Sequence, residues 1–75
     1  MPYVNVKLIK GVFDPQEKQE MITQLTETMV GIEGEAMRGV TWVTIHEVRS
    51  GDWGIAGKPL TTAAVKELAA GKVAA

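Results

Sequence analysis

Two strand patterns separated by a single long helix pattern constrain the fold of this chain more than any other feature. Residues 3–9 alternate, with Val4, Val6 and Leu8 on one face, and residues 40–47 are rich in β-branched and aromatic side chains. Both runs are typical of β-strands. Two strands joined through one helix pair in parallel with a right-handed crossover. The order therefore predicts a single β-α-β unit, an α/β fold (α+β by some conventions).

Clear signals mark the start and the end of the helix between the strands. Asp14 can accept hydrogen bonds from the free backbone amides of the first turn, and Glu17 follows at the spacing of a capping box. Pro15 suits the first helical position because the donor that it lacks would be unpaired there. The helix is predicted to run to about Val30 and to stop at Gly31 and the glycine that follows at position 34.

The last third of the chain predicts only short elements. Residues 50–54 read as a turn, and residues 55–59 are short and irregular, with the composition of a small hairpin. Thr61 or Thr62 can cap a final helix, and the tail 70–75 is expected to fray. The expected architecture is therefore the β-α-β unit followed by a C-terminal hairpin and helix.

The size and composition of the chain predict self-association. Its 75 residues are expected to form one domain, 1–75, but the hydrophobic fraction is 45% and there is no cysteine to form a disulfide. A domain this small is marginally stable alone, and two parallel strands with one helix cannot enclose a core. Burial of apolar faces between copies is the simplest solution, so the chain is predicted to form a homo-oligomer.

Charge and patterning exclude several classes of partner. The net charge is −1 and no basic run is longer than two residues, so nucleic acid is not an expected partner. No apolar stretch reaches the roughly 20 residues that span a bilayer, and the N-terminal residues lack the basic segment and apolar core that are typical of a signal peptide. A single histidine and no cysteine make a metal site improbable. We expect a cytoplasmic protein without a membrane or metal partner.

The residue that carries the clearest chemistry is Pro2, which only Met1 precedes. Aminopeptidases remove an initiator methionine when the next side chain is small, and the mature chain would then begin with a secondary amine. An α-amino group titrates near roughly 7.7–8 in peptides. Burial or nearby cations lower that pKa towards neutrality, where a general base works best. An ordinary chain start is the alternative interpretation.

Four features in order resemble the tautomerase superfamily, and in particular its small 4-oxalocrotonate tautomerase group. They are the Pro2 start, the strand with its closing glycine (2–11, PYVNVKLIKG), the helix start (14–18, DPQEK) and the hairpin (51–57, GDWGIAG). The resemblance covers residues 2–58. It implies a β-α-β subunit that assembles as a hexamer, a trimer of dimers.

The resemblance also implies an activity that requires no cofactor. The nitrogen of Pro2 would move a proton between an enol or unsaturated keto acid and its isomer, which makes the chain a tautomerase (isomerase). The alternative activities that the resemblance implies are those of a hydratase, a dehalogenase or a decarboxylase. In these enzymes a protonated proline helps to add water to an unsaturated acid. A catalytically silent assembly subunit and a small-molecule binding module remain further alternatives.

The sequence departs from the pattern of the group at its two arginines, which hold the substrate carboxylate and polarise its carbonyl. Their positions are occupied by Val12 and Trp42, and neither side chain can bind an anion in bidentate fashion. The aromatic residue of the hairpin is retained as Trp53. The missing arginines predict a substrate that is smaller, less charged or aromatic.

Five side chains are candidates for the remaining roles. Arg38 is the best available anion partner, with a solvated loop arginine as the alternative. Trp42 and Trp53 are predicted to line an apolar substrate pocket, and the alternative for Trp42 is a subunit-interface aromatic. His46 is a candidate second acid or base, or simply a half-exposed polar residue. Tyr3, beside the predicted base, could contribute its hydroxyl group.

Overall fold

The computed structural model describes residues 1–71. Their contacts divide the chain into two compact units: the first is Met1–Val6 with Asp14–His46, and the second is Lys7–Phe13 with the chain from Glu47 onward. The sequence predicts that residues 1–75 form one domain. That prediction depends on how the two units are joined, and it stays a prediction. Most of the predicted frayed tail, residues 72–75, lies outside the described residues.

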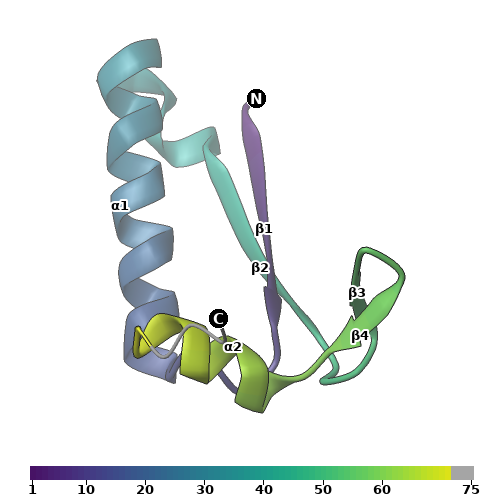
Figure 1. The fold of residues 1–75 in the computed structure, drawn as a ribbon. Coiled ribbons are helices and arrows are strands. Elements are labelled where there is room, and N and C mark those ends of the chain that lie inside the picture. Colours follow the sequence, from purple (N-terminus) through teal and green to yellow (C-terminus); the bar gives the residue numbers. More distant parts are fainter. Residues whose placement is uncertain (72–75) are drawn as a thin grey trace. The chain divides into compact units, whose positions relative to one another are not determined.

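The elements follow the predicted order, and their mixture of strands and helices confirms the fold class (Figure 1). In chain order they are β1 (Tyr3–Ile9), α1 (Pro15–Glu33), the short 3₁₀ helix η1 (Glu35–Val40), β2 (Trp42–Val48), β3 (Trp53–Ile55), β4 (Lys58–Leu60) and α2 (Thr62–Ala69).

Strands β1 and β2 form a two-stranded sheet. At its start, within the first unit, the backbone N–H of Trp42 donates to the carbonyl oxygen of Pro2 at 3.1 Å. At its end, within the second unit, the backbone N–H of Lys10 donates to the carbonyl oxygen of Val48 at 2.7 Å. Because starts pair with starts and ends with ends, the strands are parallel, as the β-α-β pattern predicts.

Burial in the sheet follows the two-residue period of an extended chain. In the first unit Val4 and Val6 are half-buried, whereas Tyr3 and Asn5 are exposed. Within the first unit, helix α1 lies along one side of the paired segments of β1 and β2 (Figure 1). Only two apolar side chains among residues 1–71 are buried, Val30 of α1 and Ile9 of β1, each 6% exposed. A single chain therefore has a very thin core.

The start of α1 is as predicted, and of the two glycines expected to stop the helix only the second does so. The side chain of Asp14 accepts from the backbone of Glu17 at 2.7 Å, and the carboxylate of Glu17 accepts from the backbone of Asp14 at 3.0 Å, completing the capping box. Gly31 was expected to stop the helix and instead lies inside it. The helix ends at Gly34, whose φ of +105° is a conformation that favours glycine. Composition alone does not distinguish a helical glycine from a terminating one.

The second strand begins later than its β-branched run predicts. Val40 is the last residue of η1, and β2 begins at Trp42. Between them, the hydroxyl of Thr41 lies 2.6 Å from the Glu33 carboxylate and 2.8 Å from the carbonyl oxygen of Met37. A local hydrogen bond of this kind offers the backbone an alternative to the sheet ladder. Val40 therefore ends η1, although valine favours strands.

The second unit contains the predicted hairpin and final helix. Strands β3 and β4 are antiparallel, with Trp53 opposite Leu60. Their two-residue loop, Ala56 and Gly57, has φ values of +53° and +79°, which is the pattern of a type I′ turn. Thr61 caps α2 by accepting from the backbone of Ala64 at 3.2 Å, so the cap is the first of the two predicted threonines.

Candidate functional site

Pro2 is held at the start of the sheet by its own carbonyl group. This oxygen accepts the backbone N–H of Trp42 at 3.1 Å, and Pro2 is half-buried. Met1 precedes it and is 76% exposed. A proline nitrogen that is joined to Met1 belongs to an amide and carries no basic lone pair. The predicted base therefore exists only in a chain from which Met1 has been removed.

Two aromatic rings lie next to this position and form what we call the aromatic corner, Tyr3 and Trp42. Their ring centroids are 6.5 Å apart and their planes meet at 85°, an edge-to-face arrangement. Tyr3 is 61% exposed and Trp42 is 54% exposed. Large parts of both rings are therefore open to contact with another molecule, either a ligand or a second subunit.

Three polar side chains on the same face form a connected group that we call the hydroxyl cluster: Tyr3, Asn5 and Thr44. The Tyr3 hydroxyl and the Thr44 hydroxyl are 2.8 Å apart, and the Asn5 amide donates to the Thr44 oxygen at 2.7 Å. Sequence reasoning considered Tyr3 but missed Asn5 and Thr44. The alternation of each strand places these residues on one face, but only the register between strands shows that they meet.

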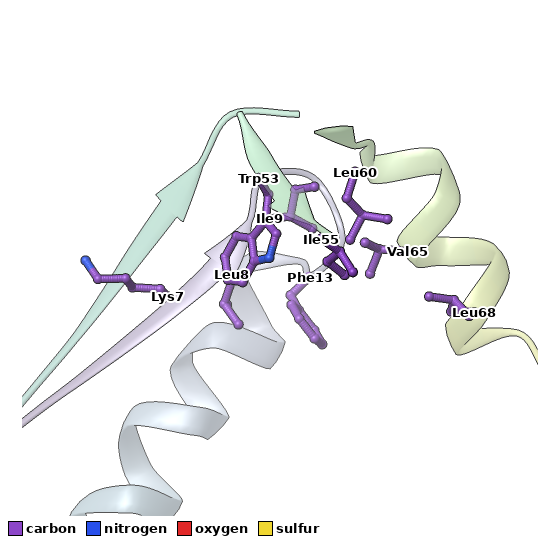
Figure 2. Close-up of a pocket in the computed structure, with 9 residues that line it drawn as sticks. All are labelled: Lys7, Leu8, Ile9, Phe13, Trp53, Ile55, Leu60, Val65 and Leu68. Atoms are coloured by element: carbon purple, nitrogen blue, oxygen red, sulfur yellow. The ribbon is translucent and has the colours of Figure 1, made fainter. Parts of the chain in front are cut away.

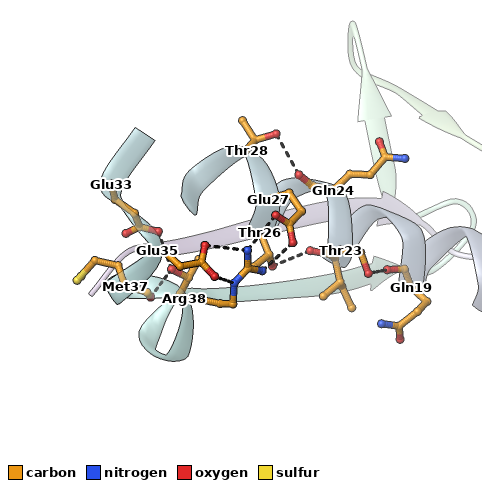
Figure 3. A network of polar contacts seen from close by, with 12 residues as sticks. Gln19, Thr23, Gln24, Thr26, Glu27, Thr28, Glu33, Glu35, Met37 and Arg38 are labelled. Atoms are coloured by element: carbon orange, nitrogen blue, oxygen red, sulfur yellow. Dashed lines mark hydrogen bonds and ion pairs between the residues drawn. The ribbon is translucent and has the colours of Figure 1, made fainter. Parts of the chain in front are cut away.

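Arg38 lies in η1 between two carboxylates (Figure 3). Its Nη1 and Nη2 donate to Glu27 of α1 at 2.6 and 3.0 Å, and its Nε and Nη2 donate to Glu35 at 2.7 and 3.1 Å. These bonds use four of the five N–H donors of a guanidinium group. The contacts of Arg38 therefore do not support its predicted role as the anion partner of a substrate.

This ion-pair network perturbs the titration of its members. Hydrogen bonds to Glu27 and Glu35 raise the pKa of Arg38 above its usual range. The hydrogen bond from Arg38, followed by its charge, lowers the pKa of Glu27 below the usual value of 4.5, and the hydrogen bond from Arg38 also lowers the pKa of Glu35. The network joins η1 to α1 immediately before β2. Its structural role is therefore to fix the segment of chain that leads into Trp42.

We expect the replacement of Arg38 by Gln to remove an acid-dependent part of the stability. Because the folded pKa values of Glu27 and Glu35 lie below 4.5, the stabilisation is fully present above 4.5 and is lost as pH falls through the folded values. Denaturation midpoints measured from about pH 6 to about pH 3 should fall more steeply in the wild type than in Arg38→Gln. The pairs are exposed, so the difference should be modest and should shrink with added salt.

Arg49→Gln is the matched control for this experiment. Arg49 bonds Asp52 at 3.2 Å, but its side chain is 79% exposed and makes no second ion pair among the described residues. Its replacement should leave the acid dependence unchanged. An equal effect of both substitutions would show that the Arg38 network contributes no more acid-dependent stability than a single exposed ion pair.

Trp53 lies in the second unit, where it lines an apolar cavity of about 310 Å³ (Figure 2). Figure 2 shows the ammonium end of Lys7 pointing away from the other lining groups. The cavity therefore suits apolar matter and has no charged group directed into it from the residues drawn. The lining residues are Lys7, Leu8, Ile9, Phe13, Trp53, Ile55, Leu60, Val65 and Leu68.

The structure brings together only some of the predicted site residues. Pro2 and Trp42 are joined by a backbone hydrogen bond within the first unit, and His46 is an exposed residue of β2 in that unit. Trp53 and Val12 belong to the second unit. The predicted roles of Trp53 and His46 stay predictions.

The described residues contain neither a metal-binding cluster nor a helix that could cross a membrane. No cluster of three or more His, Cys, Asp or Glu side chains among residues 1–71 is placed to hold a metal ion. No helix within the same range is both long and apolar enough to cross a membrane.

Comparison with known proteins gives concordant results. The sequence model of the family described as "Tautomerase enzyme" matches residues 2–63. The chain is 33% identical over 61 residues to "Probable tautomerase K2" of Dickeya dadantii (strain 3937), an alignment that covers 81% of this chain and 90% of the relative.

Solved structures show the same likeness. The crystal structure of apo unfused 4-OT matches with a TM-score of 0.70 at 28% identity, covering 79% of this chain and 93% of that one. A structure from a study of the 4-oxalocrotonate tautomerase isozymes of Methylibium petroleiphilum matches with a TM-score of 0.69 at 28% identity, covering 85% and 97%.

Proposed function

The chain belongs to the tautomerase family, and on this premise we propose that it is a cofactor-independent tautomerase of a small enol or unsaturated keto acid. The nitrogen of Pro2, free after removal of Met1, accepts a proton from the substrate and returns a proton to a substrate carbon. The amine ends each cycle in its starting state, so the reaction needs no oxidant and no cofactor.

The observation that carries this proposal is the hydrogen bond between the Trp42 amide and the Pro2 carbonyl. Chain termini usually fray unless something ties them down. Here the first strand pairing fixes Pro2 beside the aromatic corner, where a base has a defined position.

Assembly into a homo-oligomer, most simply a hexamer, completes the proposal. Ile9 and Val30 are the buried apolar side chains of residues 1–71, whereas large apolar side chains remain exposed in both units. Association of copies would remove this surface from water, which is the main driving force for a thin-cored subunit. We also propose that the protein acts in the cytoplasm, which is the location expected from its sequence. The exposed side chains include Tyr3, Ile32, Val40, Trp42, Ile55 and Leu68.

Two measurements test the proposal together. Intact mass of the protein purified from its native host should correspond to a chain without Met1. The same sample should accelerate the ketonisation of phenylenolpyruvate, followed by the loss of enol absorbance. Protein that retains Met1, prepared with a blocked aminopeptidase, is the matched control and should be inactive. A natural chain that keeps Met1, or a trimmed chain without any enol turnover, would contradict the mechanism.

A second candidate function is a catalytically silent assembly subunit. The observation that favours it is the engagement of Arg38 by Glu27 and Glu35, which leaves this guanidinium unavailable to a substrate carboxylate. A silent subunit would depend on a second, arginine-bearing chain. Co-purification of such a chain, with activity only in the mixed assembly, would favour this alternative over the tautomerase.

A further inference from the structure

The chain enters β2 through a residue that is held at three points. Thr41 stands between η1 and Trp42, and it is half-buried. Its hydroxyl lies 2.6 Å from the carboxylate of Glu33 and 2.8 Å from the carbonyl oxygen of Met37. Its backbone N–H donates to the carbonyl oxygen of Arg38 at 3.3 Å. The backbone immediately before the Trp42 amide therefore has a fixed direction.

The contact between Thr41 and Glu33 is the strongest of the three. A threonine hydroxyl has one hydrogen to donate, and here two acceptors lie within its reach. A separation of 2.6 Å is that of a charge-assisted O–H···O⁻ bond, which is roughly twice as strong as a bond between neutral groups. Glu33 is the last residue of α1, a helix of 19 residues. The bond therefore ties the entry into β2 to the end of α1.

We infer that Glu33 and Thr41 are positioning residues for the amine of Pro2, which they orient through the backbone of Trp42. This inference rests on the proposed function, because it concerns how the proposed base is held. Neither side chain takes part in the proton transfer. Both act through the hydrogen bond that the Trp42 N–H donates to the Pro2 carbonyl oxygen.

The direction of the Pro2 nitrogen depends on very few rotations. The nitrogen and the Cα of a proline belong to one rigid ring. Once Met1 is removed, rotation about the bond between Cα and the carbonyl carbon is the main motion that turns this ring relative to β1. The Trp42 N–H bonds the carbonyl oxygen at 3.1 Å and restrains that rotation. If the Trp42 amide moved away, the ring would be free to turn, as chain termini usually are.

Errors of placement have large kinetic effects, because a general base must meet its proton at hydrogen-bond distance. A displacement of about 1 Å that is caused by a distant substitution can lower a rate about a hundredfold. The Glu33–Thr41 bond restrains the base indirectly, through the backbone of Trp42. Its loss is therefore expected to have a smaller effect, of roughly tenfold.

The kinetic test follows the ketonisation of phenylenolpyruvate by trimmed protein. Thr41→Val removes the hydroxyl and keeps the shape of the side chain, and it should lower kcat by roughly tenfold with little change in KM. Thr41→Ser keeps the hydroxyl and should retain most of kcat. Thr26→Val is the matched control, because Thr26 is also half-buried and donates to the carbonyl oxygen of Ile22 at 2.7 Å, but lies within α1. It should leave kcat unchanged.

Glu33→Gln tests whether the two residues act through their shared bond. Gln keeps the length of the side chain but not its charge, so kcat should fall less than in Thr41→Val. The variant with both substitutions should have the kcat of Thr41→Val alone, because the bond is already absent there. Losses that add in the double variant would show that the residues act independently and would overturn the inference.

Hydrogen exchange of the Trp42 backbone amide measures the positioning without turnover. Glu33 is not a sequence neighbour of Trp42, so its replacement leaves the intrinsic exchange of this amide unchanged. Exchange should be at least about fivefold faster in Glu33→Gln than in the wild type, and unchanged in Thr26→Val. This comparison decides the inference even if Thr41→Val does not fold, because an unchanged rate in Glu33→Gln would overturn it.

The two measurements separate this inference from the proposed function. Faster exchange of the Trp42 amide without any loss of kcat would overturn the positioning role and leave the tautomerase standing. A trimmed wild type without enol turnover would overturn the proposed function and, with it, the positioning role of Glu33 and Thr41.

Discussion

Replacement of Pro2 by Ala is expected to lower the ketonisation rate of phenylenolpyruvate by at least about a hundredfold, the lower end of what a positioned general base contributes. Ala also permits removal of Met1, but its primary amine can rotate about a bond that the pyrrolidine ring of proline fixes. The lone pair therefore loses its orientation towards the substrate. The measurement is kcat and kcat/KM at several pH values, on protein whose trimmed mass has been verified.

The structure explains why this substitution should leave the fold intact. Among residues 1–71, the hydrogen bond of Pro2 to the rest of the sheet is made by its carbonyl oxygen, which accepts from Trp42, and alanine retains that oxygen. Circular dichroism and the mass of the assembly should match those of the wild type. Full activity in a correctly trimmed Pro2→Ala protein would remove proline from the mechanism.

The second large effect concerns stability. Ile9 is one of two buried apolar side chains in the described part of the chain, at 6% exposed, and its replacement by Ala is expected to reduce the free energy of unfolding by about 2–5 kcal/mol. The loss combines the transfer of the side chain to water with the cavity that remains. Small domains are stable by only about 5–15 kcal/mol, so one such change removes a large share of that stability.

Ile32→Ala is the matched control, because the same side chain is removed from a position that is 79% exposed. Urea denaturation of both variants should be measured at several protein concentrations, because association adds to the apparent stability. Ile9→Ala should shift the midpoint at every concentration, whereas a shift in Ile32→Ala that depends on concentration would identify Ile32 as an interface residue. Equal, concentration-independent shifts would show that Ile9 does not anchor the core.

The identity of most elements follows from local chemistry that the sequence displays. Strand β1 matches its alternating pattern from Tyr3 to Ile9, and the start of α1 matches the capping signals of Asp14 and Glu17. The hairpin and α2 also fall where turn residues and threonine caps predict them. These signals are short-range, since each depends on residues within one turn or one strand, and a single sequence can therefore specify them.

The ends of the elements and the contacts between side chains depend on tertiary interactions, which cannot be read from the sequence. Gly31 continues α1 although glycine usually weakens a helix, and Val40 joins η1 rather than β2. The partners of Arg38 come from an η1 carboxylate and from Glu27 of α1, eleven positions away. Sequence alone offered Arg38 as the best anion partner, and it could not show that Glu27 and Glu35 bond this guanidinium.

The sequence by itself determined the family, the order of the elements and the position of Pro2 at the start of β1, because local propensity and motif spacing are properties of neighbouring residues. Only the tertiary structure decided that Thr44 meets Tyr3 and Asn5, and that Trp42 lies against the backbone of Pro2. The physical reason is the register of the parallel sheet. A slip of one residue would turn each side chain to the opposite face, and that register is set by packing and pairing between segments some forty positions apart.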